Sequence, residues 1–461
     1  MGPGISVNDA AYSSLRSNVS SLGRLLGETI ADAEGQPFLD LVEQIRQLSK
    51  SAREGTVGDR EELQAVLHNL GNEQLVPVAR AFSQFLNLAN IADQHHNVSR
   101  EADPMLSASH SLLNGLGELL EEGVAPESVI DAVRELQIEL VLTAHPTEIT
   151  RRTLIHKHGE IGRCLAQLEL TGLTERECDR LNARLRELIA QIWFGDDFRT
   201  ERPTPVDEAK WGFAVVEDSL WRAVPEFMRR LDRALFDSCG EHLPLDISPV
   251  SFVSWMGGDR DGNPNVTAPV TAQVMLLSRW QAADLYLADV VHLVEELSMT
   301  SCSDTLRQMA GGAHEPYRVV LRQLRNLLRH TRVAIEAELD GTIAPEGEVL
   351  HSTAQLWQPL YACYESLVDS GMQIIADGAL LDLLRRVRCF GVHLVRHDVR
   401  QDSARHTQVL SELTTWLGLG DYAAWDEEAR RAFLLRELAS RRPLVPHHWQ
   451  PSDDVREVLD T

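Results

Sequence analysis

The sequence lacks the features that define several large protein classes. It has no apolar run long enough to cross a bilayer, and its start, Met1-Gly-Pro-Gly, lacks the basic and apolar regions of a signal peptide. Its six cysteines are far apart and form no CxxC pair, which is typical of reduced thiols in a cytosolic protein. It contains no GxxxxGK[ST], GxGxxG or GxSxG motif. These absences argue against a membrane protein, a disulfide-rich secreted domain, a P-loop or dinucleotide-binding enzyme and an α/β-hydrolase. We expect a cytoplasmic protein.

Positive charge is also scarce. Lys and Arg number 44 against 69 Asp and Glu, which gives a formal net charge of −25 over 461 residues. A polyanion gains nothing from an acidic surface, so we expect neither nucleic acid nor an anionic membrane as a partner. An acidic protein that binds an anionic substrate must concentrate its arginines locally, and motifs that contain arginine therefore become the candidate sites.

The dominant pattern in the chain is that of amphipathic helices. Apolar residues with helical spacing form four clear sets: Leu15, Val19, Leu22 and Leu26; Leu181, Leu185, Leu188 and Ile192; Leu287, Val290, Val291 and Val294; and Leu356, Leu360, Cys363 and Leu367. Three short segments, Ile138–Thr143, Val250–Trp255 and Phe390–Arg400, are instead rich in β-branched or aromatic residues and end in polar side chains. This arrangement predicts an α/β, predominantly α-helical protein with parallel strands, in either a (β/α) barrel or an open sheet.

The first polar segment is Leu-Thr-Ala-His-Pro-Thr-Glu at Leu142–Glu148, followed by Arg151-Arg152. A residue before proline is pushed out of the α region, so we expect His145 on extended backbone just past a strand end. Its pKa range suits a general acid/base or an electrostatic stabiliser. The alternative is a histidine that only hydrogen-bonds in a turn.

The second segment is Trp255-Met-Gly-Gly-Asp-Arg-Asp-Gly-Asn-Pro264. Its glycines and proline predict tight turns, with Arg260 between Asp259 and Asp261. A surface turn with local salt bridges is one interpretation. The large apolar residues Trp255 and Met256 favour a loop that folds over a site and excludes water. The pattern does not complete a calcium loop.

The third segment is Val395-Arg-His-Asp-Val-Arg-Gln-Asp-Ser-Ala-Arg-His406. In a strand, Arg396, Asp398 and Arg400 would share one face. An exposed edge strand could carry such charges, but a polar site is the other interpretation, since an arginine fork suits a carboxylate or phosphoryl group. The histidine pairs elsewhere lack metal-ligand spacing, so zinc is not expected.

LTAHPTE followed by a double arginine, WMGGDRDGNPN and VRQDSARH occur in this order, and with them the chain resembles the phosphoenolpyruvate carboxylase family, most closely its bacterial branch. The likeness runs from the segment at Leu15 to Thr461. It implies a mostly helical homotetramer built round an eight-stranded (β/α) barrel, allosterically regulated. Such an enzyme uses Mg²⁺ or Mn²⁺ to join phosphoenolpyruvate and bicarbonate, giving oxaloacetate and phosphate, and so supplies the tricarboxylic acid cycle. The reaction runs through carboxyphosphate and the pyruvate enolate.

The resemblance also implies roles for individual residues. His145 matches the family histidine that takes the carboxyl proton of carboxyphosphate, and Arg400 matches an arginine that balances phosphoryl charge. Trp255 matches a residue that shields CO₂ and the enolate from water. Arg260 and Asp261 match the core of the glycine-rich motif and are expected to bind substrate.

The remaining matches concern an effector and two departures. Arg151 and Arg152 match a double arginine assigned in plant relatives to a sugar-phosphate activator site. Where the family usually has an apolar residue the chain has His397, and where it has Glu the chain has Asp402. By strand parity His397 would face away from Arg400, so altered packing is expected there more than altered chemistry.

The chain is short for this resemblance. A family member is about twice as long, and its second half carries the acidic metal ligands and further essential arginines, none of which occurs here. We therefore expect no metal ligands in this chain and an incomplete (β/α)₈ barrel with many added helices. The expected organisation is an N-terminal helical region at 1–130, then the first part of the barrel at 131–461, ending in an unfinished helix. We expect such a piece to be inactive alone; the alternative is a truncated, non-catalytic interaction or regulatory module.

Overall fold

The computed structural model describes residues 13–53, 57–101, 112–143, 152–195, 203–260, 263–441 and 443–461. The chain divides into two compact units, one comprising Met1–Asn114 and Thr150–Glu201 and the other Gly115–Ile149 and Arg202–Thr461. The division predicted at residue 130 stays a prediction. None of the described helices is both long and apolar enough to cross a bilayer.

The first unit is built from helices. They are α2 (Ser13–Glu34), α3 (Gln36–Arg53), α4 (Val57–His68), α5 (Asn72–Glu101), α8 (Arg152–Leu168) and α9 (Glu175–Trp193). The predicted apolar faces of α2 and α9 point into the core of this unit, because Leu22 on α2 and Leu185 and Leu188 on α9 are almost completely buried there. Thr174 and Glu177 form a capping box that fixes the start of α9.

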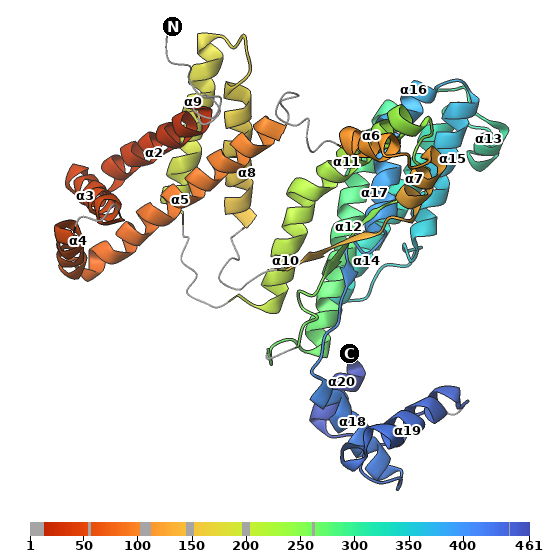
Figure 1. The fold of residues 1–461 in the computed structure, drawn as a ribbon. Helices are drawn as coiled ribbons and strands as arrows, with labels where there is room; N and C mark the ends of the chain where they lie inside the picture. The colour runs from red at the N-terminus through yellow and green to blue at the C-terminus, as the bar shows by residue number, and fades with distance from the viewer. Residues whose placement is uncertain are drawn as a thin grey trace. The chain divides into compact units, whose positions relative to one another are not determined.

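The second unit contains the sheet and most of the helices of the chain (Figure 1). Its helices, of which α6 begins at the boundary between the units, are α6 (Leu112–Glu121), α7 (Pro126–Glu135), α10 (Pro205–Val215), α11 (Trp221–Cys239), α12 (Ala268–Glu296), α13 (Asp304–Met309), α14 (Pro316–Leu339), α15 (Thr353–Asp369), α16 (Gln373–Ile375), α17 (Leu381–Phe390), α18 (Ser403–Trp416), α19 (Glu427–Ala439) and α20 (Asp453–Asp460). Two π-helical turns, η1 (Val216–Leu220) and η2 (Ala376–Leu380), lead into α11 and α17, and a 3₁₀ turn, η3 (Tyr422–Ala424), follows α18.

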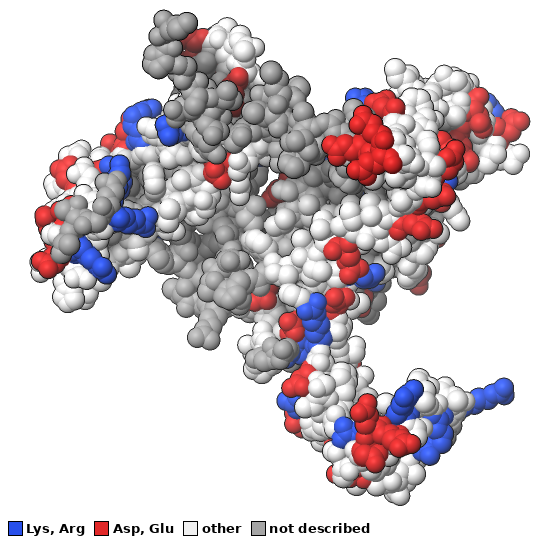
Figure 2. All heavy atoms as spheres, in the orientation of Figure 1, with Lys and Arg blue, Asp and Glu red and all other residues white. Residues whose placement is uncertain are grey.

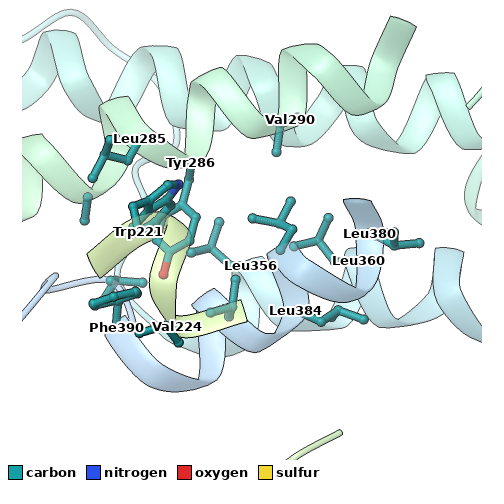
Figure 3. Packing of buried hydrophobic residues seen from close by; sticks show 14 of the residues in the cluster. Trp221, Val224, Leu285, Tyr286, Val290, Leu356, Leu360, Leu380, Leu384 and Phe390 are labelled. Carbon is teal, nitrogen blue, oxygen red and sulfur yellow. The ribbon is translucent and has the colours of Figure 1, made fainter. Parts of the chain in front are cut away.

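The core of the second unit lies between α11, α12, α15 and α17 (Figure 3). The Trp221 ring stacks on Phe390 at 5.1 Å and meets Tyr286 edge-on at 5.0 Å between ring centroids. Leu356 and Leu360, predicted to share an apolar face of α15, are fully buried here. Burial of such side chains stabilises the fold by about 1.5–3 kcal/mol each.

The sheet has three parallel strands in the order β1 (Ile138–Leu142), β2 (Val250–Ser254) and β3 (Arg396–His397). Ile138 pairs with Val250 and Leu142 with Ser254, so β1 and β2 end side by side. The predictions of an α/β, predominantly helical fold and of parallel strands at the first two segments are confirmed. Parallel strands bring their carboxyl ends to one edge, which is where functional side chains gather in such sheets.

The strand expected over Phe390–Arg400 is wrong for most of its length. Phe390 is the last residue of α17, and only Arg396 and His397 form a regular strand. Between them the backbone turns sharply, with Gly391 at φ 56° and Leu394 at φ 63°. The apolar side chains of this run serve the helical core instead, because Val392, Leu394 and Val395 are all buried there.

Charge is unevenly distributed over the surface. Figure 2 shows acidic side chains gathered over α6, where Glu118, Glu121 and Glu122 are exposed. Some arginines lie inside instead. Arg385 is buried and donates hydrogen bonds to the carbonyls of Leu243 and Pro244 at 2.8 and 2.6 Å, in the connection that leads to β2. Burial lowers the pKa of Arg385 from its usual value, and the carbonyls compensate part of the cost of removing the charge from water.

Candidate active site

The segment that follows β2 forms a compact turn, which we call the glycine loop (Trp255–Arg260). The carbonyl of Trp255 accepts hydrogen bonds from the N–H groups of Gly258 and Asp259 at 2.8 and 2.9 Å. The loop is also joined to the third motif: Arg400 N–H donates to the Gly258 carbonyl at 2.9 Å, and Arg260 N–H donates to the Arg400 carbonyl at 3.0 Å. Two motifs far apart in sequence are therefore held by main-chain hydrogen bonds.

The same contact brings together two of the predicted site residues. The guanidinium of Arg400 lies over the indole of Trp255, 3.6 Å from the ring centroid. Arg400 Nη2 forms a long ion pair with Asp398 Oδ2 at 3.7 Å, and the Arg400 side chain is 44% exposed. A cation stacked on an aromatic face keeps its N–H edge free to donate hydrogen bonds. Arg400 is thus oriented by Trp255 and remains available to an anion.

Arg260 is placed differently. Its side chain is only 4% exposed, and its Nη2 donates to Thr271 Oγ1 at 2.9 Å. Thr271, itself buried on the first turns of α12, donates in turn to the Gly257 carbonyl at 2.7 Å. Burial lowers the pKa of Arg260 from its usual value. Arg260 therefore ties the glycine loop to α12, and its predicted contact with substrate stays a prediction.

Met256 attaches the glycine loop to the hydrophobic core. Its side chain is 2% exposed and belongs to the main core, where it packs against Gly212 of α10. Trp255, by contrast, is only partly buried. Of the two apolar residues expected to cover a site, Met256 thus fixes the loop and Trp255 alone stays at the surface of the loop beside Arg400.

His397 packs under the glycine loop. Its Nε2 is buried without a hydrogen-bond partner among the described residues, and a Cβ atom on Gly258 would lie 2.6 Å from it. Burial lowers the pKa of His397 below its usual value of 6.5, and the nearby charge of Arg260 acts in the same direction; the Gly257 carbonyl and Asp398 oppose it. The neutral imidazole is therefore the form that the fold selects.

This burial gives a prediction for stability. The unfolded chain takes up a proton near pH 6.5 whereas folded His397 resists it, so its contribution is intact above that pH and is lost as the pH falls below it. We expect the His397→Leu variant to lose less of its free energy of unfolding between pH 7.5 and 5.5 than the parent protein, measured by denaturant titration. The exposed His447→Gln variant is the control. Equal pH dependence of His397→Leu and parent would contradict the assignment.

The side chains of the other predicted site residues lie outside the described part of the structure. His145, Arg151 and Asp261 lie outside the described residues, and Arg152 begins α8 with its side chain outside the description. β1 ends at Leu142, beside Ser254 of β2 and three positions before His145 in the sequence. Two residues that the sequence did not single out, Thr271 and Gly212, complete the surroundings of the loop; their signals, a helical threonine and a helical glycine, are too common to find alone.

The described residues do not form a metal site. Among them, no group of three or more His, Cys, Asp or Glu side chains is arranged to hold a metal ion.

Comparisons with known proteins complete the description. Residues 15–461 match the model of the family described as phosphoenolpyruvate carboxylase. The phosphoenolpyruvate carboxylases of Vibrio atlanticus and Pectobacterium carotovorum are each 56% identical to the chain, over 450 and 455 residues, and that of Aeromonas hydrophila is 54% identical over 450 residues. In each case 98% of this chain is covered, but only 51% or 52% of the relative. The chain thus spans about half the length of the curated relatives it matches.

Proposed function

The chain belongs to the phosphoenolpyruvate carboxylase family, and from this premise we propose that it forms the N-terminal half of an enzyme that carboxylates phosphoenolpyruvate with bicarbonate. The products are oxaloacetate and phosphate. The observation that carries the proposal is the match across residues 15–461, which includes the two motifs joined at Gly258 and Arg400. The proposal extends to a cytoplasmic, allosterically regulated homotetramer that supplies oxaloacetate to central metabolism.

The three strands are, in this proposal, the first part of a (β/α)₈ barrel. β1 pairs with β2 on one edge, and within the described part of the chain no strand pairs with its other edge. The apolar residues Ile138, Leu140 and Val141 of β1 are each 40% or more exposed. An apolar edge strand left open in this way favours pairing with further strands, which the second half of the enzyme would supply.

Each site residue has a defined part in the proposed reaction. Arg400 donates hydrogen bonds to the phosphoryl oxygens as phosphate passes from the enolate oxygen to bicarbonate, and its positive charge balances theirs. Trp255 fixes the plane of Arg400 and keeps water from the enolate. His145 takes the carboxyl proton of carboxyphosphate, which then releases the CO₂ that the enolate attacks.

A divalent ion, Mg²⁺ or Mn²⁺, is expected in the complete enzyme, where it would neutralise phosphoryl charge. The described residues do not fit it, because they present no cluster of three potential ligands. We place its ligands in the C-terminal half and assign no step to residues of this chain through the metal. Arg151 and Arg152 are proposed as part of an effector site for a phosphorylated sugar.

A non-catalytic module is not favoured. Arg400 lies at the carboxyl end of the sheet with its side chain 44% exposed, where it can reach an anionic substrate. The match to carboxylases also continues through both motifs that meet there.

The proposal is tested by comparing this 461-residue chain with the full-length enzyme that contains it. We expect bicarbonate-dependent oxaloacetate formation from the full-length protein and none from the chain alone, because in this proposal the metal ligands and the remaining strands belong to the C-terminal half. Coupled oxidation of NADH by malate dehydrogenase measures oxaloacetate directly. Turnover by the chain alone would overturn the proposal that catalysis requires the C-terminal half. A full-length protein without turnover would overturn the proposed activity.

A further inference from the structure

We infer that Glu457, on the last helix of the chain, is a positioning residue for the glycine loop. It lies far from the three motifs in sequence, and its contacts are with the start of α12 and with Arg260. The structural part of this inference stands on those contacts alone. Its consequence for catalysis rests on the proposed function.

The first contact supplies a helix cap. α12 begins at Ala268, and the side chain of its N-cap residue, Thr267, makes no capping hydrogen bond. Glu457 Oε1 instead accepts a hydrogen bond from Ala268 N–H at 2.5 Å, across 189 residues of sequence. A carboxylate at the N-terminus of a helix satisfies a free N–H group and interacts favourably with the helix dipole. The cap of α12 therefore comes from α20.

The second contact concerns the buried arginine. Glu457 Oε1 lies 3.9 Å from Arg260 Nε. Nε and Nη1 of Arg260 have no hydrogen-bond partner among the described residues, although the side chain is almost completely buried. A buried charge without a counter-charge is strongly destabilising, so the nearby carboxylate compensates the guanidinium where Thr271 leaves it unsatisfied.

The helix that carries Glu457 is itself fixed to the third motif. Val455 of α20 is 1% exposed and packs in a small cluster with Val409 and Leu413 of α18. α18 begins directly after that motif, where the Asp402 carboxylate caps it by accepting the Ala404 N–H at 2.8 Å. The third motif is thus connected to Arg260 in two ways. One connection runs through α18, α20 and the start of α12, and the other is the main-chain hydrogen bond from Arg260 N–H to the Arg400 carbonyl.

These contacts predict how Glu457 affects the reaction. The glycine loop determines where Trp255 and the backbone of Arg400 lie, and Glu457 holds the loop through Arg260 and through the helix on which Thr271 is placed. Loss of the carboxylate should therefore lower kcat through misplaced groups, with little change in the affinity for phosphoenolpyruvate.

Hydrogen exchange measured by mass spectrometry on the full-length protein tests the inference. In Glu457→Ala we expect the amides of Ala268, Val270 and Thr271 and those of residues 255–260 to exchange about five-fold faster, as loss of a helix cap implies. Amides in α14 and α15 should be unaffected. Glu457→Gln, whose amide oxygen can still accept from Ala268, should keep the slow exchange at 268–271 while losing the ion pair with Arg260.

The matched control is Asp460→Ala, which removes an exposed carboxylate from the same helix. Unchanged exchange at 268–271 in Glu457→Ala, or an equal change in Asp460→Ala, would overturn the inference. Kinetics form the second readout: a several-fold fall in kcat for Glu457→Ala with KM retained supports positioning, and unchanged kcat overturns it. If the parent protein makes no oxaloacetate, the proposed function fails, while the exchange data still decide whether Glu457 positions the loop.

Discussion

The Gly258→Ala variant is expected to be severely destabilised, losing about 3 kcal/mol of its free energy of unfolding, the upper end of the usual cost of overpacking. A Cβ atom at this position would lie 2.3 Å from the backbone oxygen of Asp398 and 2.6 Å from His397 Nε2. Real Cβ atoms do not approach other atoms so closely. One of the two segments must therefore move.

Neither segment can move cheaply. Asp398 N–H donates to the Ser254 carbonyl at 2.9 Å, and Arg400 N–H donates to the carbonyl of Gly258 itself at 2.9 Å. Separating the glycine loop from the third motif breaks this ladder and leaves buried polar groups without partners, each at a cost of about 1–3 kcal/mol. Urea unfolding followed by circular dichroism measures the loss.

Another glycine of the same unit provides the control. Gly117 lies inside α6, and a Cβ atom there would meet no atom within 4 Å. Gly117→Ala is expected to be neutral or slightly stabilising, because alanine is the better helix former by about 1 kcal/mol. If Gly258→Ala were as stable as Gly117→Ala, the close approach of the loop to Asp398 would be wrong.

The second large effect is expected at Arg400. In the full-length enzyme, Arg400→Gln should lower kcat by about 10²–10³, the usual cost of removing one preorganised group that stabilises charge in the transition state. Arg400→Lys should lower it less. Lysine keeps the charge but cannot lie flat on the Trp255 indole, from whose centroid the guanidinium is 3.6 Å distant.

A second stacked arginine is the matched control. Arg388 lies 5.5 Å from the centroid of the Trp357 ring and donates to the carbonyl of Asp246, which precedes β2. Arg388→Lys removes the stack on Trp357, near the amino end of β2 and away from the site. It is expected to leave kcat within about two-fold, as for surface substitutions away from a site. Full turnover by Arg400→Gln would remove Arg400 from the reaction.

His145→Ala should lower kcat while phosphoenolpyruvate still binds.

The sequence predicts well what depends on local spacing. Helical faces such as that of Leu356 and Leu360 follow from a spacing of 3.6 residues, and the strands before His145 and Trp255 follow from short runs rich in β-branched or aromatic residues. Both signals lie within a single segment. The third strand was predicted too long because its composition, Val392 to Val395, serves burial in turns as well as in strands. Periodicity cannot separate the two cases.

The site could be predicted only in part. Trp255 and Arg400 were both chosen from the sequence, yet their stacking depends on the ladder at Gly258, which no local pattern reveals. Arg260 reads as a loop cation, but it is buried, because Thr271 lies on the following helix in reach of its Nη2. Glu457 is one acidic residue among 69, and only the folded chain distinguishes it.

The distance along the chain between the cap of α12 and the helix that supplies it has a consequence for synthesis. A ribosome adds about 5–20 residues per second, so the 189 residues from Ala268 to Glu457 take about 10–40 s to emerge. For most of that interval the glycine loop has no Arg400 backbone to pair with, because Arg400 has not yet been synthesised. Glu457 is absent throughout the interval. The loop is therefore a late-maturing part of a domain whose helices can pack early.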